Sequence, residues 1–261
     1  MLWQALFAAV AVASTALFGA PAVSGVRGDS RPLTAAEQRT FLRLVCRSHY
    51  VANGVTHCVD RIGYTVPSRP NDDLRLTAIL YGPLTRDGAR QAYVTYLSEW
   101  EPHATNFGGG ILFEAGPDGW RFSKWYPGGQ MDRCLLLPGA GRARFLCWSA
   151  YAEMGEFSQS VVVRHVLPSP ADQRIFSAAD SRAVFGNPMC ADDASSTAAP
   201  LWIYVDPVHR SHGGAFAEAT ATYATPDDVK AACSHNDLRQ LHTAKKIVRF
   251  VLSAGTVRVV E

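Results

Sequence analysis

The chain has 261 residues, of which 48% are hydrophobic and 18% are charged, and this balance excludes an intrinsically disordered protein because it supports a buried core. A formal net charge of +2 excludes the strongly basic surface that a nucleic-acid-binding protein needs. The length suits one large β domain or two small ones.

The first element is an apolar N-terminal segment. Residues Leu2–Val23 are almost all apolar or small, and the first charged side chain is Arg27. The pattern Ala20-Pro21-Ala22 is of the small-x-small type that signal peptidase accepts, so residues 1–22 are predicted to be a cleaved signal peptide. The alternative is an uncleaved membrane anchor, because the segment is about long enough to span a bilayer. Its Ala content makes it only weakly hydrophobic, which favours cleavage and a periplasmic or secreted protein.

Residues 23–167 are expected to form an N-terminal helix followed by an antiparallel β meander. Thr34 and Glu37 have the capping-box spacing, which predicts a short amphipathic helix that ends near Cys46. The stretch from there to Pro70, which contains Asn53-Gly54, is interpreted as loop.

From Leu74 the hydrophobic period changes to two, which is typical of β-strands. The segments 116–119 and 138–141 are rich in Gly and Pro and predict hairpin turns. The strands predicted in this region are Leu74–Leu80, Gln91–Ser98, Gly110–Glu114, Gly119–Tyr126, Cys134–Leu137, Arg142–Ala150 and Ser160–Leu167. The paired hairpins resemble irregular propeller blades of the kind seen in integrin-type repeats. They lack the Asp-x-Asp-x-Asp-Gly calcium loop, so the resemblance implies no function.

Residues 168–261 are expected to form a loop-rich connection and a C-terminal β/α segment packed on the same body. Pro168–Pro200 is rich in Pro, Ala, Ser and Asp, which predicts loop with a short helix near Ala178. Thr225 precedes Pro226 and two acidic residues, which predicts a second helix that ends near Cys233. Strands are predicted at Leu201–Val205, Ala215–Tyr223, Ile247–Ser253 and Thr256–Val260.

Together these elements indicate a mainly β fold class: an antiparallel meander that forms a sandwich, a barrel or partial propeller-like blades, with two short helices. The strands do not alternate regularly with helices, which argues against a parallel sheet.

Six cysteines, an even number, predict disulfides in an exported protein. Proximity in the sequence favours the pairs Cys46–Cys58, Cys134–Cys147 and Cys190–Cys233. The alternative for the first pair is a zinc site, since zinc prefers thiolate and imidazole ligands and two histidines, His49 and His57, lie beside these cysteines. An oxidising compartment favours the disulfide, so we expect no metal and no cofactor.

Two loops carry candidate ligand-binding residues. The first runs between predicted strands, where functional groups concentrate, and contains Glu101, His103, Asn106 and Gly109. Its Glu101–His103 pair is a candidate general acid and base, and its glycines are a candidate pocket floor. The second loop is rich in Gly and contains His209 and His212, which are candidates for a metal site or a general base. For both loops, the simpler interpretation is a solvated polar turn.

Aromatic residues cluster in the predicted meander, and exposed aromatic rings can stack on sugars. The alternation of Trp120 and Phe122 with polar residues places them on one face of a strand, which favours a core role instead. The cluster consists of Trp100, Trp120, Trp125, Tyr126, Trp148 and Tyr151.

Motifs of the familiar hydrolases, zinc proteases, thiol oxidoreductases and nucleotide enzymes are absent from the sequence. We therefore expect an exported, disulfide-stapled, non-catalytic binding or interaction protein of the bacterial envelope or secretome. Its expected partner is an envelope or extracellular protein or a glycan, with no nucleic acid and, after signal cleavage, no membrane. The alternatives are a secreted hydrolase, metal-assisted or not, with a His/Glu loop site, and an assembly component held at the membrane by an uncleaved N-terminal helix.

Overall fold

The fold is taken from a computed structural model of the chain. The structure describes residues 27–52, 55–64, 72–98, 106–139, 141–153, 156–166, 170–182, 190, 199–212, 214, 216–235, 238–253 and 256–260. The predicted signal peptide, residues 1–22, lies outside the described residues.

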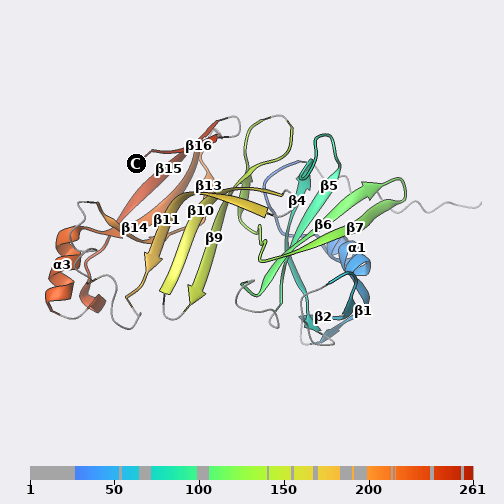
Figure 1. The fold of residues 1–261 in the computed structure, drawn as a ribbon, viewed down its shortest axis with the longest axis horizontal. Helices are drawn as coiled ribbons and strands as arrows, with labels where there is room; N and C mark the ends of the chain where they lie inside the picture. The colour runs from blue at the N-terminus through green and yellow to red at the C-terminus, as the bar shows by residue number, and fades with distance from the viewer. Residues whose placement is uncertain are drawn as a thin grey trace, which may run out of the picture.

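Four antiparallel sheets make up most of the described chain. Figure 1 shows them in two halves, with β1–β7 and α1 on one side and β9–β16 and α3 on the other. The predicted fold class, mainly β with an antiparallel meander and two short helices, is confirmed.

The N-terminal half begins with α1 (Ala35–Val45), whose N-cap is Thr34. Thr34 and Glu37 form the predicted capping box, since each side chain accepts a hydrogen bond from the other residue's backbone N–H. Sheet B follows directly, with the strands β1 (Cys46–Ala52), β2 (Val55–Arg61) and β3 (Asp72–Asp73). The loop predicted from Cys46 onwards is therefore wrong for β1 and β2. Ala52 pairs with Val55 across Asn53-Gly54, a dipeptide typical of two-residue hairpin turns.

Sheet A is the predicted meander, and each strand pairs with the next along the chain. Gly116 pairs with Gly119, which confirms the first predicted hairpin turn. Its strands are β4 (Arg75–Gly82), β5 (Gln91–Leu97), β6 (Gly108–Gly116) and β7 (Gly119–Pro127).

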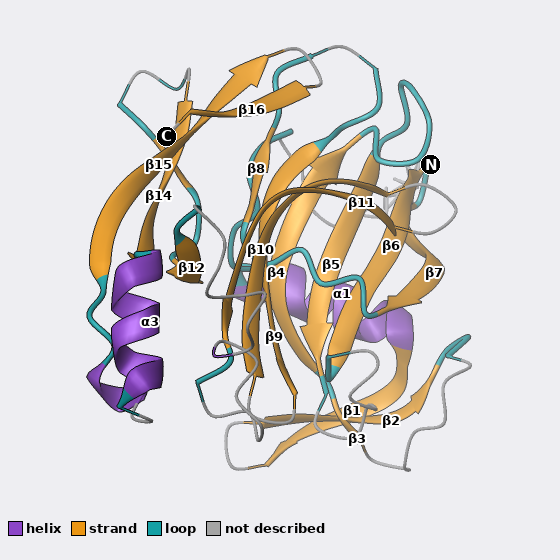
Figure 2. Ribbon diagram, turned by 60° about the vertical axis from the view of Figure 1, so that its left-hand side comes forward, coloured by secondary structure: helices purple, strands orange, loops and turns teal. Residues whose placement is uncertain are grey.

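Sheet C continues the meander and is strongly curved (Figure 2). Its strands are β8 (Cys134–Leu136), β9 (Phe145–Glu153), β10 (Glu156–Val166) and β11 (Pro170–Asp180). The loop and short helix predicted around Ala178 are wrong, because β11 pairs with β10 along its whole length. Residues 167 and 168, the expected division of the chain, lie outside the described residues.

Sheet D forms the C-terminal half together with α3 (Pro226–Ser234), which begins with the predicted Thr225 cap. Its strands are β12 (Leu201–Val205), β13 (His209–Arg210), β14 (Phe216–Ala224), β15 (Ala244–Ser253) and β16 (Thr256–Val260). A 3-10 turn, η3 (Leu238–Gln240), follows α3.

Sheets A and C each contribute side chains from both faces to a core, because side chains alternate along their strands. In β5, Val94 packs in the core that contains Phe41 of α1, whereas Tyr93 packs in the core shared with sheet C. In β10, Val162 belongs to that shared core, whereas Val161 belongs to the core between sheets C and D. The order of layers is therefore α1, sheet A, sheet C and sheet D.

An N-terminal segment connects the edges of sheets A and C. Arg31 forms an antiparallel bridge with Ile79 of β4. The neighbouring Ser30 donates its backbone N–H to Cys134 O of β8 at 2.8 Å and accepts from Cys134 N through its hydroxyl at 2.7 Å. Asp29 accepts from Leu136 N at 2.6 Å and from Arg210 of β13 at 2.6 and 2.8 Å. Residues 29–31 thus contact three of the four sheets.

All three predicted disulfides are present: Cys46–Cys58, Cys134–Cys147 and Cys190–Cys233. Disulfides of this number are typical of a protein that folds in an oxidising compartment. Within the described part of the chain, no helix has the length and apolar character needed to cross a bilayer.

Candidate functional site

The face of sheet C that packs on sheet A changes from apolar to polar along its strands. Near β8, this face is formed by Phe145, Cys147 and Val162, which lie in the core shared with sheet A. Towards the β9–β10 turn, the cross-strand pairs on the same face are Ser149–Ser160 and Tyr151–Ser158. A hollow of about 490 Å³ lies over this polar part. Its lining, which we call the sheet-C hollow, consists of Ser149, Ala150, Tyr151, Ser158, Ser160, Val162, Asp172 and Arg174.

Several hydroxyl groups of the sheet-C hollow are available to a ligand. Among the described residues, neither Ser149 nor Ser160 has a side-chain hydrogen-bond partner, and the Ser158 hydroxyl only approaches Tyr151 O at 3.5 Å. A serine hydroxyl can donate one hydrogen bond and accept two. The hollow therefore presents donors and acceptors on neighbouring strands.

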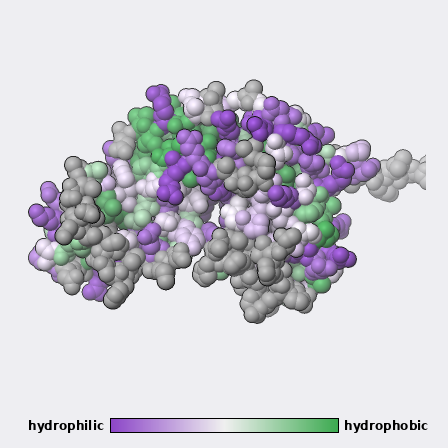
Figure 3. Space-filling view, viewed as in Figure 1, coloured by the Kyte–Doolittle hydropathy of each residue, from purple (hydrophilic) through white to green (hydrophobic). Residues whose placement is uncertain are grey.

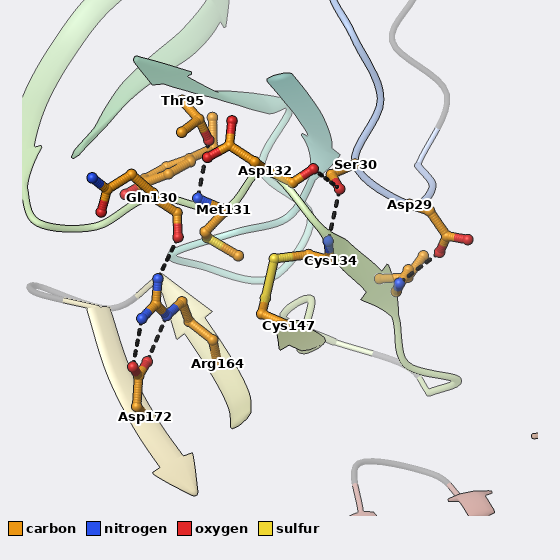
Figure 4. The surroundings of a disulfide bond; sticks show 12 residues. Asp29, Ser30, Thr95, Gln130, Met131, Asp132, Cys134, Cys147, Arg164 and Asp172 are labelled. Atoms are coloured by element: carbon orange, nitrogen blue, oxygen red, sulfur yellow. Dashed lines mark hydrogen bonds and ion pairs between the residues drawn. A yellow bond between two sulfur atoms is a disulfide. The ribbon is translucent and has the colours of Figure 1, made fainter. Parts of the chain in front are cut away.

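Asp172 of the sheet-C hollow forms an ion pair with the buried Arg164 (Figure 4). Arg164, whose side chain is 8% exposed, holds Asp172 by two hydrogen bonds of 2.6 and 2.5 Å and also donates to Gln130 O. The Asp172 charge is therefore neutralised by a fixed partner. Arg174 makes no ion pair with a described residue, so once Arg164 has neutralised Asp172, Arg174 leaves one unbalanced positive charge at the hollow.

The chain segment after Gln130 fixes the junction of sheets A and C (Figure 4). Met131 N donates to the Thr95 hydroxyl at 3.1 Å, and Asp132 O accepts from the Ser30 hydroxyl at 2.8 Å. Burial raises the pKa of the Asp132 carboxyl, although the Thr77 hydroxyl donates to it. These contacts connect sheet A, the N-terminal segment and the Arg164 side of sheet C.

A second hollow of about 400 Å³ lies at the end of β5. Beneath it the Arg61 guanidinium, 7% exposed as a residue, donates to the Ser98 hydroxyl at 2.9 Å and to Asp73 O at 2.8 Å. Its lining is Asp73, Arg75, Leu97, Ser98 and Phe107.

Asn106 and Phe107 connect the two hollows. The Asn106 amide donates to Ala150 O of the sheet-C hollow at 3.1 Å, whereas Phe107 lines the second hollow. Both residues have a left-handed backbone, with φ of 52° and 57°, which L-residues adopt at a cost of about 1 kcal/mol. Gln130 holds this backbone by donating to Asn106 O at 2.8 Å.

Only part of the first predicted loop is among the residues that the structure describes. Glu101 and His103 lie outside the described residues, whereas Asn106 donates to Ala150 O of the sheet-C hollow but does not itself line it. Gly109 is buried in β6, where an added Cβ would lie 2.3 Å from Tyr126 O. These glycines thus allow close contact of β6 with its neighbours.

The second predicted loop lies on a different sheet. His209 is on β13 and His212 follows it in a turn, and both are exposed. Neither lines either of the two hollows, and the described residues contain no group of three or more His, Cys, Asp or Glu that could hold a metal.

The zinc alternative is wrong, because the two sulfur atoms of Cys46 and Cys58 are bonded to each other and cannot ligate. His57 instead stacks on Tyr50, with ring centroids 4.9 Å apart, and approaches Asp73 at 3.3 Å.

Most of the aromatic cluster serves the core. Trp125 is 6% exposed, and Trp148 donates its indole N–H to Val205 O at 2.8 Å, which attaches β12 to sheet C. Trp100 lies outside the described residues, and Tyr151 lines the sheet-C hollow.

The serines of the hollow and its two charged residues, Asp172 and Arg174, are absent from the sequence-based candidates. A usable signal was present in β10, where Ser158 and Ser160 alternate with Phe157 and Gln159 and so lie on one face. Asp172 and Arg174 were hidden because β11 was interpreted as loop.

Comparison with protein-family models, curated proteins and solved structures finds no match to this chain. The fold and the hollow define the class: a mainly β, disulfide-bonded protein with a polar hollow on one face of sheet C.

Proposed function

We propose that the protein is an exported binding protein and that the sheet-C hollow is its ligand site. The observation that carries this proposal is the pair Ser149–Ser160, whose hydroxyls have no hydrogen-bond partner among the described residues, at the point where the apolar face of sheet C ends. A polar group that lacks a protein partner inside a hollow gains hydrogen bonds when a polar ligand enters, and no hydrogen bond within the protein has to be broken first.

The lining indicates the chemistry of the ligand. Hydroxyl groups on adjacent strands suit a ligand with several hydroxyl or amide groups, and Arg174 adds attraction for a negative charge. A glycan or a polar segment of an envelope or extracellular protein has these properties. The three disulfides and the apolar N-terminal segment support export to the periplasm or the medium.

Binding is favoured over hydrolysis by the interactions of Asp172, the one carboxylate among the described lining residues. A serine nucleophile needs a base that can take its proton, but Asp172 is held by two hydrogen bonds from Arg164.

Ligand screening with matched serine variants tests this proposal. We expect some members of a panel of neutral and acidic oligosaccharides to raise the melting temperature of the wild-type protein, and Ser149→Val and Ser160→Val to abolish the rise. Ser177→Val is the control, since Ser177 pairs with Ser160 on the same face but is exposed and outside the lining. An equal rise in all three variants would place the ligand elsewhere.

The hydrolase alternative rests on the Glu101–His103 pair and on His209 and His212. Turnover of an ester, glycoside or peptide substrate that is lost in Glu101→Gln or His209→Ala would favour it over the binding proposal.

A further inference from the structure

Sheet D has one face in the core and one face that is only partly covered. Ala217, Ala219 and Phe250 lie in the core between sheets C and D. On the opposite face, α3 covers the end of the sheet near Ala224 and Ile203, where these residues form a small core with the helix. No helix of the described chain covers the other end of this face, over β14, β15 and β16 (Figure 1).

The strand register places apolar and basic side chains together on this uncovered end. Phe216 pairs with Val251, and Val251 with Arg258. One row further, Glu218 pairs with Arg249, and Arg249 with Val260. Two more cross-strand pairs extend the face: Thr220–Ile247 and Thr222–Lys245. We call the following set the sheet-D patch: Phe216, Lys245, Ile247, Arg249, Val251, Arg258 and Val260.

The apolar members of the sheet-D patch are unusually open to solvent. Ile247 is 54% exposed, Val260 48% and Phe216 41%. Figure 3 shows a hydrophobic area over this part of sheet D with hydrophilic residues around it. Isolated exposed apolar residues are common, but a contiguous group on three neighbouring strands marks an interaction surface.

The charges of the patch have one sign. Arg249 donates to Glu218 at 2.9 Å, so this pair is neutral overall. Lys245 and Arg258 form no ion pair with a described residue, which leaves two unbalanced positive charges among the apolar side chains. An occupant of the patch must therefore supply both an apolar environment and negative charge.

We propose that the sheet-D patch docks the protein on an anionic lipid surface. Cations and apolar groups alternate within the patch itself, whereas the centre of a protein–protein interface is depleted of charge. A second copy would bring the same cations face to face, which like-charge repulsion opposes. At a bilayer surface the two kinds of group separate naturally: apolar side chains enter the acyl boundary while Lys and Arg reach the anionic headgroups.

This inference replaces the expectation that the mature chain makes no contact with a membrane. It is independent of the sheet-C hollow, because the hollow lies on the face of sheet C that points away from sheet D. A membrane-docked protein can therefore keep the hollow open to its ligand.

Vesicle binding with paired variants tests the inference on the full mature chain. We expect the protein to sediment with vesicles of equal parts phosphatidylglycerol and phosphatidylcholine but not with pure phosphatidylcholine. Loss of one cation is worth about five-fold in partitioning, so the double variant Ile247→Ser/Arg258→Gln should bind at least about ten-fold more weakly.

The control is Val51→Ser/Arg121→Gln, which removes one exposed apolar residue and one exposed cation from sheets B and A and should bind as the wild type does. Equal vesicle binding by the two double variants, or no binding by the wild type, would overturn the inference. Size-exclusion chromatography with light scattering gives a third outcome: a wild-type dimer that Ile247→Ser/Arg258→Gln abolishes would assign the patch to a second copy instead.

Discussion

Glu37 carries a negative charge that is almost completely removed from water, since the residue is 2% exposed. Arg31 donates two hydrogen bonds to its carboxylate, at 2.6 and 2.8 Å, and Tyr81 donates a third at 2.6 Å. The Arg31 hydrogen bonds, followed by those of Tyr81 and Thr34, outweigh the effect of burial and lower the pKa of Glu37 from 4.5 to about 2. The charged form of this residue therefore stabilises the fold.

This pKa predicts acid sensitivity of a defined kind. Because the folded-state pKa is the lower one, the stabilisation is present above about pH 4.5 and is lost as the pH falls towards 2. It amounts to at most about 3 kcal/mol of unfolding free energy. Urea unfolding at a series of pH values should show this loss in the wild type and a flatter profile in Glu37→Gln. Parallel profiles for the two proteins would contradict it.

Position 110 has no space for a side chain and therefore requires glycine. A Cβ at this position would lie 1.9 Å from the Tyr93 ring, which is fully buried and donates its hydroxyl to Gly129 O at 2.6 Å. Gly110→Ala should therefore cost roughly 3 kcal/mol or prevent folding, because the ring has no space to move into. Gly88→Ala is the control, since its φ of 69° carries strain but no atom lies within 4 Å. Similar melting temperatures for the two variants would disprove the steric argument.

Residues whose role is local were predictable from the sequence. The caps at Thr34 and Thr225 depend on atoms three residues away, and the short-loop disulfides depend on cysteines close in the chain. The pair Ser149–Ser160 was not predictable, because its significance arises only when two strands pair and the core ends beside them. Binding sites assembled between strands have no local sequence pattern.

At the scale of elements, strand pairing overrode composition in β11. Its residues include two alanines in a row and lie in a segment rich in Pro, Ala and Ser, which favours loop. In the structure, ten pairs with β10 satisfy its backbone groups on one side, while Phe176 and Ala178 enter the core. The β1–β2 hairpin was missed for a different reason: Asn53-Gly54 was interpreted as part of a loop, and the residues on either side of it were not recognised as strands.

The segment 29–31 is the element that joins sheets A and C, and its side chains replace missing backbone partners. Asp29→Ala and Ser30→Ala each leave one backbone N–H of β8, at Leu136 and Cys134, without its acceptor. We expect each variant to lower stability by about 1–3 kcal/mol. Hydrogen exchange should accelerate at these two amides and remain slow in β5.

Ser123→Ala, on the exposed side of β7, is the matched control for this experiment. Unchanged hydrogen exchange in β8 of the Asp29→Ala and Ser30→Ala variants would mean that segment 29–31 contacts the sheets without stabilising them.

At the scale of the whole molecule, stability depends on three covalent links spread over the layers. Cys134–Cys147 lies in the core shared by sheets A and C, Cys46–Cys58 joins β1 to β2, and Cys190–Cys233 ties residue 190 to α3. In the chain-entropy model each of the two short-loop disulfides contributes roughly 3 kcal/mol. Two such links are a large part of the 5–15 kcal/mol that stabilises a typical domain.

We therefore expect the folded protein to require its disulfides. Mass spectrometry of the chain recovered from its exported compartment should show a mass without the hydrogens of all six thiols and without roughly the first 22 residues. Loss of the Cys134–Cys147 disulfide should lower the melting temperature most, because opening this bond also loosens the core between sheets A and C. The double variant Cys134→Ala/Cys147→Ala isolates this effect, and Cys190→Ala/Cys233→Ala, at the periphery, is its control. If both variants melt at the wild-type temperature, these disulfides do not contribute to the stability of the fold, and the packed layers alone maintain it.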